Sequence, residues 1–453
     1  MRFSPYRRLM LKLMASSAAL PLAMPVVAAF GQDLAGRIII LSDLHSAYER
    51  TGQLLAAVEA EIAGNAAPHL IFINGDVFEA GNVVASRSQG AIDWAFVEAL
   101  GKLAPTVLNI GNHEPDLATD LADVVSKAKE MGITVISNIV DARSGAGFTE
   151  PSAKLALGDL PVKVVGIATN AVGTYPAAVR ETLDIPEAPQ WAEENLPALL
   201  DGEGLSVVLS HAGVVADRAM LPMLADGTLL IGGHDHLLFE HEEGRTRYVH
   251  TGSWSSVYTV AEIGADQSIT LKQVTVDAEA APSPVLGELI AATLAEHMTA
   301  EELAEIGTSP AAMTLAETGR FVAKTMAAGA EGDIGFIGHT TLGTGLPAGP
   351  VSKYAFDAVV RFDGKLVVAE VDAATLAEIL AVCNQDEAKT LEQRTGDFLY
   401  AAPADLPTRD SYRLVTNDWS ATNQKSYFGR EDLVFTPGPD IALKALVVDA
   451  LKA

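Results

Sequence analysis

The sequence of 453 residues contains a single cysteine, Cys383. One thiol cannot form an intramolecular disulfide, so no disulfide framework supports the fold, and the cysteine count says nothing about the compartment. The preceding residues 376–382 are largely apolar. We therefore expect the thiol to lie in the core beside a helix rather than to act as a nucleophile.

Positively charged residues are scarce. The chain has 31 Lys and Arg against 58 Asp and Glu, which gives a formal net charge of −27. This excess of carboxylates repels nucleic-acid polymers and anionic membranes, so we expect neither as a partner. A small anion that a metal ion chelates could still bind locally. The sequence does not indicate an oligomeric state.

The N-terminal hydrophobic stretch is interrupted, which argues against a stable membrane span. Residues 13–29 are mostly apolar but contain two serines and two prolines, and basic residues that include Arg7, Arg8 and Lys12 precede them. Such a segment is typical of an export signal, predicted here over residues 1–29. The Arg7-Arg8 pair resembles the twin-arginine export signal, and an ordinary secretory signal or an uncleaved anchor are the alternatives. We therefore expect a periplasmic or extracellular protein.

The length exceeds what one hydrophobic core usually serves, so about two to three domains are expected. In the first half, short apolar runs alternate with helical patterns, which favours βαβ units. The expected strands are 38–41, 70–73 and 107–110, and the expected helices are 51–63 and 91–103. Strands with shorter connections follow at 162–167, 206–209, 246–250, 257–263 and 269–276. They suggest a second, partly antiparallel sheet, so the predicted fold class is α/β, a two-sheet α/β/β/α sandwich over residues 37–277.

A change of composition marks the predicted domain boundary. Residues 278–290 combine an Ala-, Glu- and Pro-rich stretch with the start of an amphipathic helix, and we expect them to link two domains. Residues 291–453 are predicted to form a smaller α+β domain. Its expected strands are 334–337, 356–362, 366–371, 398–401 and 412–416.

Residues that can bind metal follow five hydrophobic runs of the first domain. They are Asp43 and His45, Asp76, Asn112 and His113, His211, and His234 with His236. Open α/β sheets place ligands just beyond the carboxyl ends of their strands, so all five groups can meet at one rim. Carboxylate, amide and imidazole ligands together indicate transition metals.

Each group alone has a simpler explanation. A Gly-Asp pair such as Gly75-Asp76 is mostly a turn, and a histidine that follows a strand, such as His211, is more often a core residue than a ligand. The order of the five groups along the chain and their common position at strand ends favour a metal centre.

In this order the motifs resemble those of the calcineurin-like metallophosphoesterases. The pattern is Asp-x-His, Gly-Asp, Gly-Asn-His-Glu, a single His and Gly-His-x-His, and it extends over residues 38–252. The resemblance implies two divalent metal ions, with Mn, Zn, Fe, Mg or Co as candidates. It assigns one ion to Asp43, His45, Asp76 and His236, and the other to Asp76, Asn112, His211 and His234. Asp76 would bridge the two ions.

The resemblance also implies a mechanism. Two ions about 3.5 to 4 Å apart lower the pKa of a bridging water, and the resulting hydroxide attacks the phosphate ester in line. His113 would contact the phosphoryl group and donate a proton to the leaving oxygen. Asp116 would fix the tautomer of His113. Glu114 would help to hold the metal ligands in place without binding the ions itself.

Residues 303–435 resemble the substrate domain of the 5'-nucleotidase and UDP-sugar hydrolase family. The matching motifs are Glu317-Thr318-Gly319-Arg320-Phe321, Gly332-Asp333-Ile334, residues 346–351, Arg361-Phe362-Asp363-Gly364 and Val415-Thr416-Asn417-Asp418-Trp419. In that family two aromatic rings enclose the nucleotide base, and Phe362 and Tyr427 occupy the corresponding places. The alternative is that Phe362 is a core residue of a hairpin and Tyr427 a surface residue.

The sequence departs from the pattern of this second family in two segments. The family carries an Asn- and Gly-rich loop that ends in Arg, whereas residues 338–343 read Gly-His-Thr-Thr-Leu-Gly. Asn-Gln-Lys-Ser at residues 423–426 replaces the Gly-Gly-Asp-Gly run before the second aromatic. His339 and Thr341 are candidate substrate contacts, or parts of a tight turn. Neither reproduces the bidentate grip of Arg, so the resemblance implies hydrolysis without implying specificity for AMP.

The sequence thus predicts an exported dinuclear phosphoesterase that hydrolyses phosphate monoesters, with 5'-nucleotides or related nucleotide compounds as substrates. The enzymatic alternative is a phosphodiesterase, for example one acting on cyclic nucleotides, or a hydrolase of another phosphorylated or sulfur-bearing compound. The non-enzymatic alternative is a periplasmic binding or metal-sequestering protein on a hydrolase scaffold. Sequestration would not require His113 and Asp116.

Overall fold

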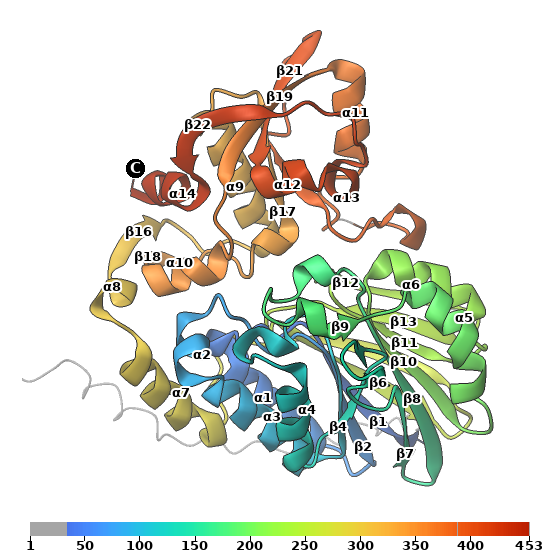
Figure 1. The fold of residues 1–453 in the computed structure, drawn as a ribbon. Coiled ribbons are helices and arrows are strands. Elements are labelled where there is room, and N and C mark those ends of the chain that lie inside the picture. The colour runs from blue at the N-terminus through green and yellow to red at the C-terminus, as the bar shows by residue number, and fades with distance from the viewer. Residues whose placement is uncertain (1–33, 387, 453) are drawn as a thin grey trace, which may run out of the picture. The chain divides into compact units, whose positions relative to one another are not determined.

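Two six-stranded sheets carry the first half of the chain, shown in blue and green in Figure 1. The computed structural model describes residues 34–386 and 388–452. The predicted export signal at residues 1–29 lies outside the described residues. Among the helices of the described residues, none is both long enough and apolar enough to span a membrane.

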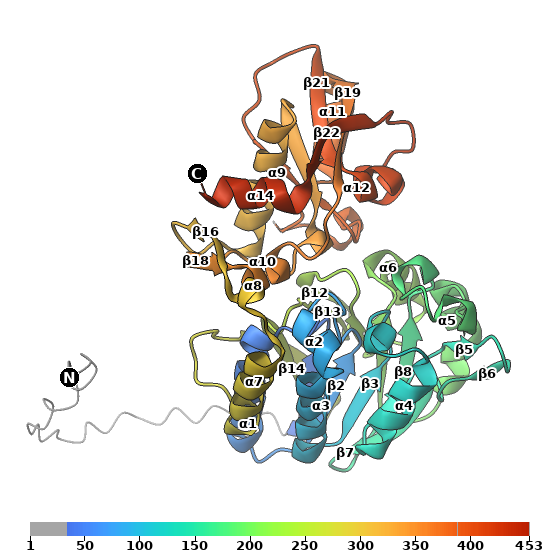
Figure 2. The ribbon, with the colours of Figure 1, turned by 60° about the vertical axis from the view of Figure 1, so that its left-hand side comes forward.

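The first sheet has the strand order β15-β14-β1-β2-β3-β4. Its strands are β1 (Leu34–Leu41), β2 (His69–Asn74), β3 (Thr106–Asn109), β4 (Thr134–Ile136), β14 (Val257–Gly264) and β15 (Ile269–Thr275). The strands β1 to β4 are parallel, as the predicted βαβ units require. Figure 2 shows the helices α1 (Tyr48–Ala63), α3 (Ala91–Leu103), α4 (Leu121–Glu130) and α7 (Pro284–His297) on the outer side of this sheet.

The second sheet has the order β12-β13-β11-β10-β8-β7. Its strands are β7 (Ser152–Leu157), β8 (Leu160–Ala168), β10 (Leu205–His211), β11 (Leu229–Gly232), β12 (Leu238–Glu243) and β13 (Thr246–Thr251). The four central strands are parallel and the two outer ones antiparallel. The helices α5 (Ala188–Leu199) and α6 (Val214–Met220) contribute to a core cluster together with residues of this sheet. The predicted α/β/β/α sandwich is confirmed.

The assignment of strands 257–263 and 269–276 to the second sheet was wrong. The strand β14 pairs antiparallel with the free edge of β1, with Ile38 opposite Ala261, and β15 continues the first sheet. Apolar alternation predicts that a strand exists, but it does not identify which of two exposed sheet edges the strand will join.

The buried strands are apolar on both faces, which is typical of covered parallel sheets. In β1 the side chains of Ile38 and Ile40 join the core between the two sheets, whereas Ile39 and Leu41 join the core under the helices. All four are completely buried. Because successive residues of a strand point to opposite faces, one short apolar run fills two cores and leaves the next residues at the sheet rim.

The C-terminal domain contains a five-stranded sheet with the order β20-β17-β21-β19-β22. Its strands are β17 (Ile334–Gly338), β19 (Lys365–Asp372), β20 (Leu399–Ala402), β21 (Ser411–Asn417) and β22 (Thr436–Ala442). The accompanying helices are α9 (Leu315–Gly329), α10 (Lys353–Val359), α11 (Ala373–Ala381), α12 (Asp418–Thr422), α13 (Gln424–Phe428) and α14 (Leu443–Lys452). Cys383 is buried just after α11, as expected.

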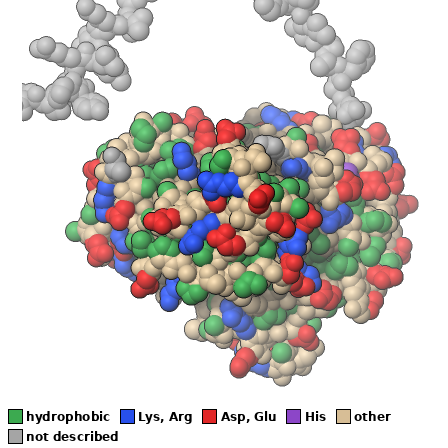
Figure 3. Space-filling view, turned by 90° about the horizontal axis from the view of Figure 1, so that it is seen from above, with side chains coloured by type: hydrophobic (Ala, Val, Ile, Leu, Met, Phe, Trp, Pro, Cys, Tyr) green, Lys and Arg blue, Asp and Glu red, His purple; other side chains and the backbone are tan. Residues whose placement is uncertain are grey.

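Figure 3 shows Asp and Glu side chains spread over one face of the molecule with Lys and Arg between them.

The predicted strand at residues 356–362 was wrong, because helix α10 occupies most of this segment. The side chain of Ser352 caps the helix by accepting a hydrogen bond from the backbone N–H of Ala355 at 3.2 Å. Phe356 and Val359 are buried on the same helix face. A spacing of three to four residues between apolar positions fits a helix as well as a strand in so short a run, and the capping serine decides the outcome.

Helix α7 begins inside the predicted linker, at Pro284, and packs on the first domain. Its residue Leu286 belongs to the core under α1 and α3. The Oγ of Ser283, just before the helix, donates to Glu59 of α1 at 2.9 Å. The division into residues 37–277 and 291–453 stays a prediction.

A buried carboxyl group joins helices α1 and α3. The hydroxyl of Tyr48 donates to Asp93 at 2.5 Å, and both side chains are buried. Burial raises the pKa of Asp93 to about 7, although the hydrogen bond from Tyr48 acts in the opposite direction. A carboxyl group with this pKa holds its proton in the folded state under conditions where the unfolded chain releases it.

We expect the substitution Asp93→Asn to stabilise the protein at alkaline pH. Because the folded pKa of Asp93 lies above its unfolded value, its contribution to stability is complete below the unfolded pKa and is lost as the pH rises through the folded value of about 7. Asparagine does not ionise, so the Tm of the variant minus that of the parent should rise by a few degrees between about pH 5 and pH 8. A difference in Tm that does not vary with pH would contradict this assignment.

Candidate active site

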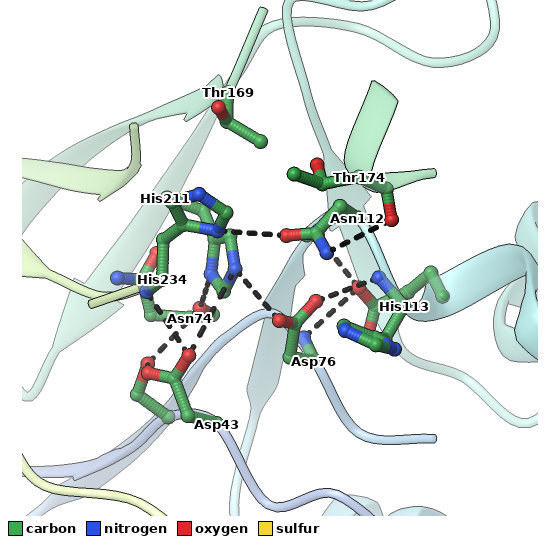
Figure 4. Close-up of polar contacts among 12 residues, drawn as sticks. Asp43, Asn74, Asp76, Asn112, His113, Thr169, Thr174, His211 and His234 are labelled. Atoms are coloured by element: carbon green, nitrogen blue, oxygen red, sulfur yellow. Dashed lines mark hydrogen bonds and ion pairs between the residues drawn. The ribbon is translucent and has the colours of Figure 1, made fainter. Parts of the chain in front are cut away.

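The ends of five strands bring the seven predicted metal ligands together. Strands β1, β2, β3, β10 and β11 lead to Asp43 and His45, Asp76, Asn112, His211, and His234 with His236, respectively. Figure 4 shows Asp43, His211 and His234 on one side of Asp76, and Asn112 with His113 on the other. All seven side chains are buried or half-buried.

One group of ligand atoms comes from Asp43, His45 and His236, whose ligand atoms all lie within 4.8 Å of one another. The Nε2 atoms of His45 and His236 are 2.8 Å apart. The Nε2 of His236 lies 3.8 Å from a carboxylate oxygen of Asp43. Burial, followed by the charge of Arg361, lowers the pKa of His45 to about 3, so this imidazole is neutral and can act as a ligand.

A second group comes from Asp76, His211 and His234. The Nε2 of His211 lies 3.1 Å from Asp76 Oδ2, and the Nδ1 of His234 lies 2.8 Å from the Oδ1 of Asn112. Asp76 Oδ2 also lies 3.8 Å from the Nε2 of His45 in the first group. The carboxylate of Asp76 is therefore placed between the two groups.

The hydrogen bonds of His211 show that these donors fit a cation. Its Nδ1 lies 2.6 Å from the carbonyl oxygen of Asn74, which places the ring proton on Nδ1. The buried Nε2 has no hydrogen-bond partner among the described residues, yet it faces oxygens of Asp76 and Asp43 at 3.1 and 3.9 Å. A nitrogen that faces two carboxylates needs positive charge: burial alone would lower the pKa of His211, but the charges of Asp76 and Asp43 raise it to about 10. A cation between this nitrogen and the carboxylates would supply the same charge in place of the proton. The nitrogen and oxygen donors together suit a transition metal.

The ligand loops hold an unusual backbone conformation. Asp43, His45, Asp76, His234 and His236 all have positive φ, between 50° and 78°. Such a conformation costs energy in residues with a side chain and persists only where the surroundings fix it. Here the backbone N–H of Asp43 donates to Gly75 O at 3.0 Å, and that of His45 donates to Asp76 O at 3.0 Å.

Buried polar side chains behind the ligands fix these loops further. The carboxylate of Glu114 accepts hydrogen bonds from the backbone N–H groups of Asp76, Val77 and Gly111, at 3.0, 2.9 and 2.6 Å. The amide of Asn109 donates to Asn74 at 3.0 Å, and the amide of Asn74 donates to Ser210 O at 2.8 Å in the other sheet. The sequence prediction missed both asparagines. An amide at the end of an otherwise largely apolar strand was the available signal.

His113 lies beside the metal ligands, but the resemblance assigns it to neither of the two ions. Its backbone N–H donates to Asp76 at 2.7 Å, and its Nδ1 lies 2.8 Å from the carboxylate of Asp116. The carboxylate of Asp116 also accepts from the backbone N–H of Ala80 at 2.7 Å. Burial alone would lower the pKa of His113, but the charges of Asp116 and Asp76 raise it to about 9. The imidazole therefore holds a proton that it can donate.

Residues 36–238 match the family model of the calcineurin-like phosphoesterases. These residues form a calcineurin-like phosphoesterase domain. The predicted resemblance is confirmed, and the chain is a hydrolase of phosphoric ester bonds. No curated protein matches the sequence of this chain.

Solved structures with low sequence identity share the fold of this phosphoesterase and its C-terminal domain. A 5'-nucleotidase precursor from Thermus thermophilus is 19% identical, with a TM-score of 0.61, and the match covers 92% of this chain and 96% of that one. A 5'-nucleotidase from Candida albicans is 13% identical, with a TM-score of 0.60 over 92% and 98% of the two chains. The sulfate thiohydrolase SoxB of Thermus thermophilus is 14% identical, with a TM-score of 0.62 over 92% and 94%.

A cavity of about 420 Å³ connects the phosphoesterase site to the C-terminal domain. From the phosphoesterase domain it is lined by Asp76, Asn112, His113, Gly173, Thr174, His234 and His236. From the C-terminal domain it is lined by Thr340, Thr341, Arg361, Phe362, Asp363, Asp397, Asn417, Trp419 and Tyr427. This volume is within the range of pockets that bind small organic molecules.

Three of the four predicted substrate contacts line the cavity of the phosphoesterase. Phe362 and Thr341 do so, and the side chain of Phe362 is 46% exposed. Tyr427 also lines it but is only 3% exposed. Trp419 also lines the cavity and is 54% exposed. It belongs to one of the matching motifs, but the sequence did not predict a role for it.

His339 lies outside the cavity lining. Its Nε2 donates to the carbonyl oxygen of Asp235 at 2.6 Å, and its Nδ1 accepts from the backbone N–H of Phe398 at 3.1 Å. Its ring stacks on the ring of Phe398, with centroids 4.0 Å apart. Both ring nitrogens are therefore used to hold the loop between His234 and His236 against the C-terminal domain.

Proposed function

We propose that the chain is an exported, dinuclear metal-dependent phosphoesterase that hydrolyses phosphate monoesters, with 5'-nucleotides or related nucleotide compounds as substrates. One observation supports the proposal most directly: a single cavity is lined by His113 and members of both groups of metal ligands and also by exposed aromatic rings. We assign one ion to Asp43, His45, Asp76 and His236. We assign the second ion to Asp76, Asn112, His211 and His234.

In this proposal the metal ligands and His113 divide the chemistry. Two divalent ions would supply a water nucleophile of lowered pKa and neutralise the charge that develops on the phosphoryl oxygens. His113 donates the proton that the leaving oxygen needs, and Asp116 keeps the imidazole oriented and positively charged.

The C-terminal domain would contact the organic part of the substrate. Phe362 and Trp419 offer exposed aromatic surface, which suits a flat base. Among the described residues that line the cavity, Arg361 is the only Lys or Arg, and it is paired with Glu79. A second phosphate group therefore finds no free cationic side chain in the lining, which favours substrates with a single phosphate.

Phosphate release from a panel of esters tests the proposal. We expect metal-dependent release from a nucleoside 5'-monophosphate, and slower release from a nucleotide sugar, a cyclic nucleotide and glycerol phosphate. Faster release from the cyclic nucleotide would establish the phosphodiesterase alternative. Metal binding without release from any ester would establish the binding or sequestering protein instead.

We expect Phe362→Ala to raise the KM for a nucleoside 5'-monophosphate by about 5- to 150-fold, because stacking on one base is worth about 1 to 3 kcal/mol. The kcat should change little, since Phe362 is neither a proposed metal ligand nor the proposed acid. The matched control is glycerol phosphate, which has no ring and should keep its KM. Equal losses for both substrates would mean that Phe362 supports the fold rather than the base.

A further inference from the structure

A buried arginine of the C-terminal domain reaches the candidate metal centre. The side chain of Arg361 is 3% exposed and that of Glu79 is 5% exposed. The Nε of Arg361 donates to Glu79 Oε2 at 3.0 Å, and Nη2 contacts the same oxygen. The Nη1 donates to the carbonyl oxygen of Thr340 at 3.1 Å, so the guanidinium also holds the loop that lines the cavity.

Glu79 in turn lies behind a metal ligand. Its Oε2 is 3.5 Å from the Nδ1 of His45, and the Nη2 of Arg361 is 3.3 Å from the same nitrogen. The Nε2 of His45 faces His236 and Asp76, so it can bind a cation only if the ring proton is on Nδ1. With the proton on Nδ1, Glu79 Oε2 at 3.5 Å is the acceptor that faces it, and Nη2 of Arg361, which can only donate, directs its hydrogens to Glu79. A carboxylate in this position fixes the orientation of a ligand histidine and makes it a stronger donor.

We propose that Arg361 is a positioning residue that holds Glu79 against His45, so that the affinity of the Asp43, His45 and His236 group for its cation depends on the C-terminal domain. This inference rests on the proposed function. It goes beyond that function, because every proposed metal ligand lies between residues 43 and 236. Those ligands alone would make the metal centre complete without any residue of the second domain.

Two physical arguments support the role of Arg361. Without the guanidinium, the carboxylate of Glu79 would be a buried charge without a cationic partner, so it would protonate or turn toward solvent and release His45. Direct binding of substrate by Arg361 is disfavoured, because its Nε, Nη1 and Nη2 already donate to Glu79 and Thr340. Trp254 completes the arrangement, since its ring stacks on His45 at 5.3 Å and lies 5.0 Å from the guanidinium of Arg361.

Titration of the metal-free protein with Mn²⁺, followed by calorimetry, tests the inference. In Arg361→Gln and in Glu79→Gln we expect one of the two sites to weaken by about 10- to 100-fold, the usual effect of removing a residue behind a metal ligand. The other site should keep its affinity. The double variant should be no weaker than either single variant, because both substitutions break the same connection. Arg361→Lys should recover part of the loss, since an ammonium group can still pair with Glu79.

Arg394→Gln is the matched control. Arg394 is 7% exposed, belongs to the C-terminal domain and packs its guanidinium on the ring of Phe239 at 4.2 Å, in the phosphoesterase domain. We expect this variant to bind Mn²⁺ as the parent does. Parent affinity at both sites in Arg361→Gln, or an equal loss in Arg394→Gln, would overturn the inference. If Arg361→Gln does not fold, Glu79→Gln and Arg361→Lys decide by the same criteria. Phosphate release by the parent tests the proposed function separately, because the parent keeps this connection intact.

Discussion

Substitution of Asp76 by asparagine is expected to remove at least one of the two cations and to lower kcat by about 10³-fold or more. Asp76 lies between the two groups of ligands, 3.1 Å from His211 and 3.8 Å from His45. An amide of the same shape keeps the packing but loses the negative charge that could hold two cations together. Cation stabilisation of the transition state is worth several kcal/mol, and each 1.4 kcal/mol is about a factor of ten. Metal content and phosphate release measure the two effects.

The control for this variant is Asp363→Asn. Asp363 lines the same cavity, and its carboxylate accepts from the backbone N–H groups of Gly364 and Lys444 at 2.9 and 3.0 Å, away from the ligand atoms. We expect parent metal content and a kcat within a few-fold of the parent. An Asp76→Asn variant that binds two cations and retains its activity would show that Asp76 does not bridge the groups.

Replacement of His113 by alanine should leave both cations bound and lower kcat by about 10²- to 10⁴-fold, the usual contribution of a general acid. The structural reason is that the imidazole contacts Asp116 through Nδ1 and lines the cavity through the rest of its ring. The loss should depend on the leaving group. A nucleoside oxygen needs a proton as it departs, whereas p-nitrophenolate leaves without one, so p-nitrophenyl phosphate should lose much less activity.

His241→Ala is the control for this second variant, because His241 lies on strand β12 and does not line the cavity. It should hydrolyse both esters as the parent does. Equal losses of His113→Ala toward the two esters would mean that the imidazole positions the phosphate and does not protonate the leaving oxygen.

The sequence predicts the ligand loops well, because two simple rules act together there. Apolar runs such as 38–41 and 70–73 fill both faces of a covered sheet, and the residues that follow them must lie at its rim. The structure accordingly brings Asp43, Asp76 and Asn112 together. These rules depend on local pattern and on topology, so they do not require knowledge of distant contacts.

Other features depend on contacts that a local pattern does not encode. Arg361 and Glu79 are 282 positions apart in the chain, and neither belongs to a metal-binding motif. The pairing of β14 with β1 likewise depends on a distant contact. The cap on α10 by Ser352 is different, because it is a local signal that the prediction of a strand overlooked. His339 was proposed to contact substrate because it lies in the loop that lacks the family's arginine, but its ring is used to join two loops.

The most direct test of the central claim is a crystal structure of the purified protein with anomalous data recorded at the absorption edges of manganese, iron, cobalt and zinc. Our account predicts two neighbouring anomalous peaks, one within bonding distance of Asp43, His45, Asp76 and His236, and the other within bonding distance of Asp76, Asn112, His211 and His234. A protein that binds manganese fully, but whose anomalous peaks all lie at residues other than these ligands, would contradict the account.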